Sequence, residues 1–144
     1  MLLLIDIGNS NISFAVYNDN VLINKWRIKT DKNKTADEYA IILNVLLNDY
    51  SISGVAIASV VPLITELLAT YCDKYLSKRP LIIGRGLKTG LDIKLNNPKE
   101  LGADLIAEAV GVIKKYPQPC IIIDMGTATT LALIDNNAFY GGII

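Results

Sequence analysis

Histidine is absent from this 144-residue chain, and cysteine occurs only twice, at Cys72 and Cys120. Without histidine, the chain lacks the usual general base of nucleophilic hydrolases and the commonest nitrogen ligand of metal sites. The two cysteines are far apart and lack metal-ligand spacing, which is typical of reduced, buried thiols in a cytoplasmic protein. Any acid–base chemistry must therefore come from aspartate, glutamate, lysine or tyrosine.

An excess of charge and a long apolar run are also missing. The 14 basic and 14 acidic residues give a formal net charge of zero, and the pI is about 6.2. This balance indicates no nucleic-acid partner. No apolar stretch approaches the roughly 18 residues of a membrane span, and the N-terminus opens without the basic segment of a signal peptide. We therefore expect a cytoplasmic protein with no nucleic-acid partner and no membrane partner.

Apolar residues, in contrast, are abundant. They make up 51% of the chain, and the mean hydropathy is +0.37. This content favours a sheet buried on both faces or a chain that covers more surface by association. The length is sufficient for one domain with a substantial core, but small for two.

The order of predicted elements is three strands, then alternating helices and strands, then two strands that begin anew. Strands are predicted at 2–5, 12–17, 21–28, 54–61, 80–83 and again from 121. Helices are predicted to begin at Thr35, where Glu38 completes a capping box, at Pro62, and at Asn97, the last running to about Lys115. This order predicts an α/β fold with a mixed sheet and helices on both faces.

Pro117 and Pro119 mark the point at which the pattern restarts. We therefore predict a complete first domain over residues 1–116. Residues 117–144 are predicted to be the opening hairpin of a truncated second copy.

The most informative pattern is a phrase that occurs twice, Leu2-Leu3-Leu4-Ile5-Asp6-Ile7-Gly8-Asn9-Ser10-Asn11 and Cys120-Ile121-Ile122-Ile123-Asp124-Met125-Gly126-Thr127-Ala128-Thr129-Thr130. In each copy an apolar run ends in Asp-x-Gly, and small hydroxyl or amide residues follow. The glycine allows an anion to approach the backbone, and the small polar side chains can donate hydrogen bonds to phosphate oxygens. A carboxylate beside a polyphosphate requires a cation between them, normally Mg²⁺.

A single copy of this phrase would favour an ordinary tight turn, since Asp, Gly and Asn are common turn residues. The repeat, with strands before and after each copy, favours two phosphate-binding hairpins that face one nucleotide. No helix follows the glycine, so the phrase differs from a Walker loop and from a dinucleotide fingerprint.

Several segments together resemble the type III pantothenate kinases, within the superfamily of acetate kinases, sugar kinases, Hsp70 and actin. The matching segments are Asp6–Ser13, Trp26-Arg27-Ile28-Lys29-Thr30, Ser59-Val60-Val61-Pro62, Lys88-Thr89-Gly90-Leu91, Asn97-Pro98-Lys99-Glu100-Leu101-Gly102-Ala103-Asp104, Asp124–Thr130 and Gly141-Gly142. The resemblance implies duplicated RNase H-like domains, ATP-dependent phosphorylation of pantothenate as the first step toward coenzyme A, and a homodimer.

The resemblance also implies roles for individual residues. The phosphate loop would be Asp6, Ile7, Gly8, Asn9, Ser10, Asn11, Ile12 and Ser13, with Asp6 also holding Mg²⁺. Asp124 would bind a monovalent cation, K⁺ or NH₄⁺, and Thr127 would make the second ATP contact. The pantothenate site would comprise Gly102, Ala103, Asp104, Leu105 and Leu95, with Asp104 as the acceptor of the hydroxyl proton.

Asp104 has a simpler interpretation on spacing alone. Leu101, Ile106, Ala109, Val110 and Ile113 form the apolar arc of the predicted helix, which places Asp104 on the solvated side. Two positions also depart from the family pattern, because Leu105 replaces an arginine and Leu95 replaces a tyrosine that contacts substrate. Lys88 or Lys94 could restore the lost polar contacts.

Three other interpretations remain open from the sequence. The first is a catalytically weak or inactive relative that binds nucleotide in a regulatory role. The second is a fragment without the adenosine pocket. The third is a related kinase for a more apolar small molecule.

Overall fold

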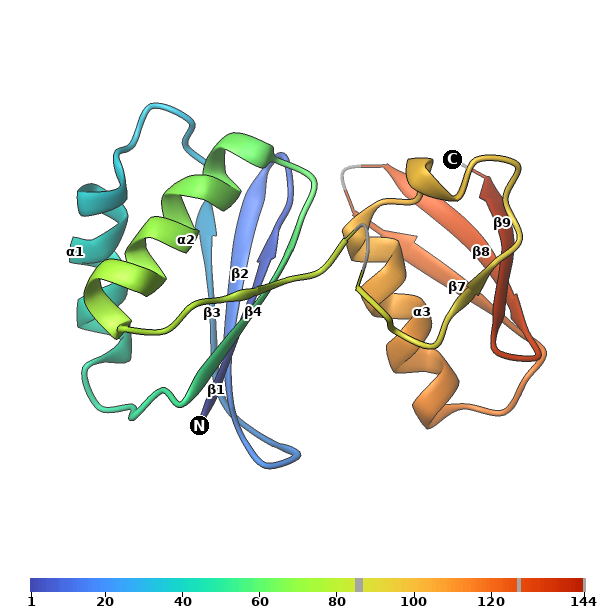
Figure 1. The fold of residues 1–144 in the computed structure, drawn as a ribbon, viewed down its shortest axis with the longest axis horizontal. Helices are drawn as coiled ribbons and strands as arrows, with labels where there is room; N and C mark the ends of the chain where they lie inside the picture. Colours follow the sequence, from blue (N-terminus) through green and yellow to red (C-terminus); the bar gives the residue numbers. More distant parts are fainter. Residues whose placement is uncertain (85–86, 127, 144) are drawn as a thin grey trace. The chain divides into compact units, whose positions relative to one another are not determined.

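The computed structural model describes residues 1–84, 87–126 and 128–143, without the side chain of Lys99. The chain divides into two compact units, which we call unit 1, Met1–Ile82, and unit 2, Ile83–Ile144 (Figure 1). Each unit has its own sheet and is described by itself.

Unit 1 contains a five-stranded mixed sheet in the order β3-β2-β1-β4-β5. Its strands are β1 (Leu2–Ile7), β2 (Asn11–Asn18), β3 (Val21–Lys29), β4 (Gly54–Ser59) and β5 (Leu81–Ile82). Strands β1, β2 and β3 form an antiparallel meander, and β4 pairs with β1 in parallel. The parallel pairing brings the C-terminal ends of β1 and β4 to the same edge of the sheet, next to the turn after β1.

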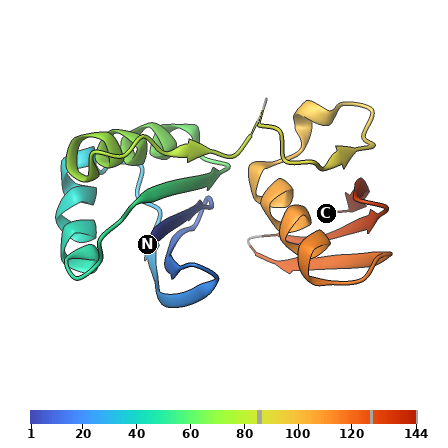
Figure 2. The ribbon, with the colours of Figure 1, turned by 60° about the horizontal axis from the view of Figure 1, so that its bottom comes forward.

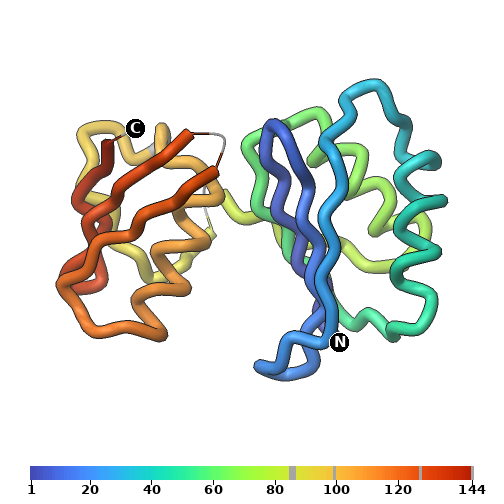
Figure 3. The backbone as a smooth tube through the Cα atoms, turned by 180° about the vertical axis from the view of Figure 1, so that it is seen from behind, coloured from blue at the N-terminus to red at the C-terminus, as the bar shows by residue number. Residues whose placement is uncertain are grey.

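Alternation along β1 divides its side chains between the two faces of the sheet. Leu3, Ile5 and Ile7 are buried, whereas Leu2 and Leu4 are exposed. The buried face packs against the helices α1 (Ala36–Leu47) and α2 (Pro62–Leu76) in one hydrophobic cluster. Both helices thus lie on the same face of the sheet, as the view from behind shows (Figure 3).

Unit 2 contains a four-stranded sheet in the order β6-β9-β8-β7. The elements are β6 (Asp92–Ile93), the 3₁₀ turn η1 (Pro98–Glu100), α3 (Ala103–Lys115), β7 (Cys120–Met125), β8 (Thr129–Asp135) and β9 (Ala138–Ile143). Helix α3 lies on one face of this sheet (Figure 2), where Ala109 packs with Ala132, Ile134 and Phe139. The other face exposes apolar side chains, namely Ile121, Ile123, Met125, Leu131, Leu133 and Ile143.

The predicted fold class is confirmed in its mixed sheets and in its order of strands and helices. Within each unit, however, the helices lie on one face of the sheet rather than on both. The predicted fold has all three helices on one sheet, whereas α3 packs on the second sheet. For the same reason the compact units separate between residues 82 and 83, and not at the 116/117 boundary of the predicted repeat. The division at 116/117 describes a sequence repeat and stays a prediction.

Three local details also differ from the prediction. The hairpin from Cys120 is extended by a third strand, β9, and β6 pairs with β9 in parallel. Helix α3 begins at Ala103 rather than at Asn97, because Pro98–Glu100 form a separate 3₁₀ turn. None of the helices in the described part of the chain is long and apolar enough to cross a membrane.

Candidate functional site

The first Asp-x-Gly phrase forms a tight β-hairpin turn between β1 and β2. The Gly8 backbone N–H donates to the Asn11 carbonyl oxygen at 2.9 Å. A Cβ on residue 8 would lie only 3.2 Å from the same oxygen. The turn therefore closes tightly at a position that favours glycine, and it leaves Asn9 and Ser10 exposed at its tip.

Thr30, directly after β3, holds this turn from the side. Its hydroxyl Oγ1 donates to the Gly8 carbonyl at 2.7 Å, and its backbone N–H donates to the Ser10 carbonyl at 3.0 Å. Two carbonyl oxygens that would repel a phosphate are thereby engaged with donors. Thr30 belongs to one of the segments that resemble the family, but a contact between residues so far apart in sequence leaves no local signal.

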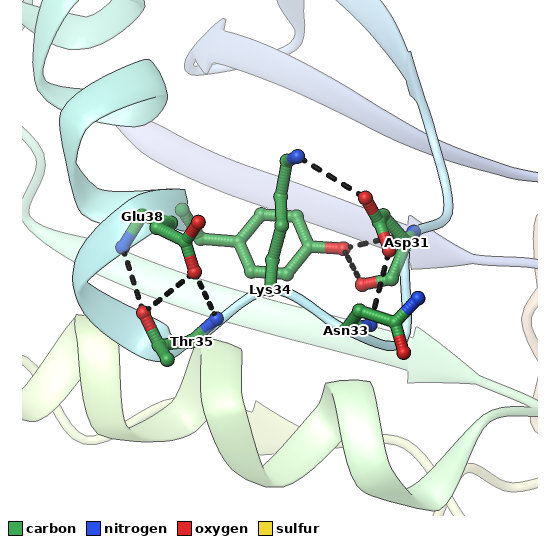
Figure 4. Close-up of polar contacts among 6 residues, drawn as sticks. Asp31, Asn33, Lys34, Thr35 and Glu38 are labelled. Atoms are coloured by element: carbon green, nitrogen blue, oxygen red, sulfur yellow. Dashed lines mark hydrogen bonds and ion pairs between the residues drawn. The ribbon is translucent and has the colours of Figure 1, made fainter.

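The loop after Thr30 is itself fixed by polar contacts (Figure 4). The hydroxyl of buried Tyr39 donates to the Asp31 carbonyl at 2.9 Å. The Asp31 carboxylate accepts the Asn33 backbone N–H at 3.0 Å and pairs with Lys34 at 3.2 Å. These two contacts lower the pKa of Asp31. The predicted capping box follows at once, with Thr35 and Glu38 exchanging hydrogen bonds at the start of α1, so the segment that carries Thr30 is anchored at both ends.

Asp6 lies on the face of the sheet opposite the helices. In the strand register it pairs with Ser13 on β2 and with Ala58 on β4. The structure thus brings Asp6 and Ser13 side by side. Ile7 and Ile12 instead point into the core, at 1% and 0% exposure. If these two residues contact a phosphate, they can do so only through their backbone.

The junction of β4 and α2 stabilises the end of the sheet at which the β1–β2 turn lies. Ser59 pairs with Ile7 across β4 and β1, and the Val60 N–H donates to the Ile7 carbonyl at 3.1 Å. The Ser59 hydroxyl accepts from the Val61 N–H at 3.0 Å and from the Thr65 hydroxyl at 2.6 Å. This network fixes the strand end that flanks the β1–β2 turn.

The second phrase forms the turn between β7 and β8, with Asp124 paired to Thr130. It is one residue shorter than the first, because six positions separate Asp124 from Thr130 while seven separate Asp6 from Ser13. The Gly126 N–H donates to the Ala128 carbonyl at 3.1 Å. Thr127, the predicted second ATP contact, lies outside the described residues.

Two oxygen atoms surround the position that a side chain on residue 126 would occupy. A Cβ there would lie 3.3 Å from Asp124 Oδ2 and 3.7 Å from the Ala128 carbonyl oxygen. Carboxylate and carbonyl oxygens are the donors that hard cations prefer. The arrangement suits the cation that the resemblance assigns to Asp124.

Asp104 lies in the first turn of α3, after Gly102 at the N-cap. It is half-buried, and its Oδ1 accepts the Leu105 backbone N–H at 2.8 Å. Ala103, Ile106 and Ala109 are the buried residues of the helix. Of the predicted apolar arc, Ile106 and Ala109 are buried, and Leu101 and Ile113 pack against the unit 2 core. Asp104 is half-buried rather than fully in solvent.

The two positions that depart from the family pattern both have packing roles. Leu95 and Leu105 pack against the hydrophobic cluster of unit 2 that comprises Ala109, Ala132, Ile134 and Phe139. Of the lysines considered as replacements, Lys94 pairs with Asp92 at 2.5 Å, and this bond raises the pKa of Lys94. Lys88 is exposed.

The described residues of each unit thus hold a separate half of the predicted site. Unit 1 presents Asp6, Ser13 and the Gly8 turn, and unit 2 presents Asp124, Gly126 and the start of α3. Among the described residues, no three His, Cys, Asp or Glu side chains gather as metal ligands. A divalent cation at Asp6 would therefore take most of its ligands from water and from phosphate oxygens.

Solved structures place this chain in the class of proteins with RNase H-like domains. The chain superposes on the Ppx/GppA phosphatase of Aquifex aeolicus with a TM-score of 0.55 and 12% identity, over 99% of this chain and 50% of that one. It also superposes on a protein of Sinorhizobium meliloti described as a 2-dehydro-3-deoxygalactonokinase, with a TM-score of 0.54 and 8% identity, over 99% and 52% of the two chains. At these identities the similarity establishes the fold alone.

Within this class, the chain belongs to the type III pantothenate kinase family, whose model matches residues 2–144. It is 47% identical to the type III pantothenate kinase of Exiguobacterium sibiricum, over 100% of this chain and 59% of that protein. Identity and coverage are the same for the relative from Halalkalibacterium halodurans, at 47%, 100% and 59%. The chain thus spans about three fifths of the length of these relatives.

Proposed function

We propose that this chain takes part in the ATP-dependent phosphorylation of pantothenate to 4'-phosphopantothenate, the first step of coenzyme A biosynthesis. The observation that carries the proposal is the family match over residues 2–144, together with two Asp-x-Gly hairpins of similar local form, one in each unit. Phosphoryl transfer asks a protein mainly to position the acceptor and to neutralise charge. The hairpins and the aspartates supply groups of the right kind.

In this proposal Asp104 accepts the proton of the primary hydroxyl of pantothenate. The hydroxyl oxygen attacks the γ-phosphorus, the bond to the bridging oxygen breaks, and ADP leaves. An aspartate is the natural base in a chain without histidine. The bond from the Leu105 N–H to Asp104 Oδ1 at 2.8 Å fixes the orientation of the carboxylate. Gly102 and Ala103 begin the same helix, beside the acceptor.

The oxygen donors of the two hairpins fit the proposed cations. Asp6 and Ser13 offer a carboxylate and a hydroxyl on one face of the unit 1 sheet, which suits Mg²⁺. Asp124 Oδ2 and the Ala128 carbonyl suit a monovalent cation, K⁺ or NH₄⁺. Bound cations would neutralise the charge of the phosphates, and Thr127 would contribute the second contact to ATP. We further propose that the protein forms a homodimer and acts in the cytoplasm.

A chimera tests the proposal. Residues 1–144 replace the matching part of the Exiguobacterium sibiricum relative, and ADP release is measured with and without pantothenate. We expect pantothenate-dependent release that falls about 10²- to 10⁴-fold in Asp104→Asn, the usual contribution of a general base. Asp73→Asn, at an exposed position of α2, is the matched control and should leave the rate unchanged.

Pantothenate-independent turnover, or equal rates for the two variants, would refute the proposal. Calorimetry on the unmodified chain separates the remaining interpretations. Binding of ATP without pantothenate would identify a nucleotide-binding module. Phosphorylation of other alcohols in preference to pantothenate would identify a different small-molecule kinase.

A further inference from the structure

Strand β3 carries a row of basic side chains on the uncovered face of the unit 1 sheet. Trp26 and Ile28 pack against the core of unit 1. Because side chains alternate along a strand, Lys25, Arg27 and Lys29 lie on the opposite face. This is the face that carries Asp6, and all three basic residues are exposed.

The strand register places Arg27 in line with the phosphate-binding hairpin. Asp6 pairs with Ser13, and Ser13 pairs with Arg27, so the three residues form one row across β1, β2 and β3. With neighbouring strands about 4.8 Å apart, Asp6 and Arg27 are separated by about 10 Å across Ser13. The next row away from the turn is apolar apart from Lys25, because Ala15 pairs with Leu4 on one side and with Lys25 on the other.

We infer that Arg27 binds the phosphate groups of the nucleotide held by the β1–β2 hairpin. The inference rests on the proposed function, and it adds a cationic contact that neither sequence motif contains. A guanidinium group donates paired hydrogen bonds that match the oxygens of a phosphate. Asp6 at one end of the row would face the cation, Ser13 would donate in the middle, and Arg27 would neutralise phosphate charge at the other end.

Lys29, the next basic residue of β3 toward the turn, is less suited to this role. Lys29 pairs with Asn11 in the register, but its charge acts on Asp31 and contributes to the lowered pKa of that carboxylate. Among the residues that the structure describes, Arg27 belongs to no ion pair. The Arg27 side chain is also exposed, so an anionic ligand can reach it.

A simpler explanation is that β3 is an edge strand whose charges prevent pairing with another chain. This explanation treats Arg27 and Lys25 alike, because both are exposed cations on the same face of the same strand. The phosphate explanation separates them, because Lys25 pairs with Ala15, two residues farther from the turn than Ser13. Lys25 is therefore the matched control.

The test measures binding of Mg-ATP, inorganic tripolyphosphate with Mg²⁺, and pantothenate to the 144-residue chain and three variants. We expect Arg27→Gln to weaken both polyphosphates about 10- to 100-fold, the range for one hydrogen-bonded charge pair. Arg27→Lys should recover part of this loss, because it keeps the charge without the paired donors. Lys25→Gln should change the affinities less than about twofold, since an exposed charge without a direct hydrogen bond to the ligand contributes little. All variants should keep the melting temperature of the parent chain.

Any of the following results would overturn the inference. Equal effects of Arg27→Gln and Lys25→Gln would identify a protective edge charge. Loss of ATP binding with tripolyphosphate binding unchanged would place Arg27 against the nucleoside, and loss of pantothenate binding alone would place it against the acceptor. If the unmodified chain binds neither polyphosphate, the proposed function fails together with this inference. If the unmodified chain binds both polyphosphates and Arg27→Gln binds them equally tightly, only the inference about Arg27 fails.

Discussion

Gly142 on β9 lies so close to Leu131 on β8 that no side chain fits between them. A Cβ on residue 142 would be 2.6 Å from the Leu131 carbonyl oxygen. Backbone atoms of a sheet cannot move aside cheaply, so we predict that Gly142→Ala destabilises the protein by about 1–3 kcal/mol. Urea unfolding followed by circular dichroism measures this change.

Gly111→Ala is the control for that prediction. Gly111 is exposed on α3, and a Cβ there would meet nothing within 4 Å. Alanine should stabilise the helix by up to about 1 kcal/mol, because glycine is a poor helix former. If both variants shift stability in the same direction, the close approach of β9 to β8 is wrong.

Thr30→Val tests the contact that holds the β1–β2 turn, the proposed phosphate-binding turn. The change removes the hydroxyl that donates to the Gly8 carbonyl at 2.7 Å while keeping the shape of the side chain. We predict a loss of about 0.5–1.5 kcal/mol of stability and weaker binding of Mg-ATP, measured by thermal unfolding and calorimetry.

Thr70→Val removes a similar bond elsewhere, from an exposed threonine of α2 to the Glu66 carbonyl at 2.9 Å. It should leave nucleotide binding unchanged, since Thr70 lies on the helix and away from the turn. Equal nucleotide affinity in Thr30→Val and Thr70→Val would show that Thr30 does not position the turn.

The Asp37 carboxylate should make stability depend on pH. It accepts hydrogen bonds from Lys74 Nζ at 2.8 Å and from the Tyr75 hydroxyl at 2.6 Å. These bonds lower its pKa below the ordinary value of 3.8. A lowered pKa in the folded state means that the stabilisation is present above the unfolded pKa and is lost as pH falls through the folded pKa.

We therefore predict that Asp37→Asn lowers the melting temperature at neutral pH and that the difference from the parent chain shrinks below pH 3.8. Melting curves of both proteins over this range provide the measurement. In the Asp37→Asn background, Lys74→Gln should have little further effect. A constant difference at every pH would contradict the assignment.

Cys72 should be chemically inert in the folded protein. It is fully buried, and burial raises the pKa of its thiol to about 12. Since the thiolate is the reactive form, we predict that iodoacetamide at about pH 8 leaves Cys72 unmodified until the chain unfolds. Cys120 is only half-buried and serves as the internal control. Peptide mass spectrometry gives both rates, and equal rates would be incompatible with the burial of Cys72.

The parts of the fold that local sequence determines were predictable. Alternation and the Asp-x-Gly turn predicted the β1–β2 hairpin, and Thr35 with Glu38 predicted the start of α1. Helical spacing places Tyr71 and Tyr75 on one side of α2, yet Tyr71 is buried at 0% exposure and Tyr75 is 40% exposed. The difference arises because the Tyr75 hydroxyl reaches Asp37.

Features that depend on distant contacts were not predictable. The periodicity of α3 indicates one buried face but not which sheet covers it, so the packing of α3 on the second sheet could not be predicted. The predicted helix start at Asn97 instead marks the 3₁₀ turn Pro98–Glu100, where the Asn97 side chain donates to Glu100 at 2.7 Å. Gly102 then adopts an extended conformation before α3 begins. The positions of Thr30 and Arg27 relative to the β1–β2 turn follow only from their pairing with residues that are distant in the sequence.

Strand β1 combines two tasks in one short segment. Its odd-numbered residues, Leu3, Ile5 and Ile7, are buried in the core of unit 1. Its even-numbered residues face away from the helices, and Asp6 among them faces the proposed ligand. A library of all substitutions along β1 should therefore show a sawtooth in tolerance, with folding yield lost at odd positions and ligand binding lost at position 6. The chemistry of this hairpin can evolve by changing one parity of positions while the other preserves the protein.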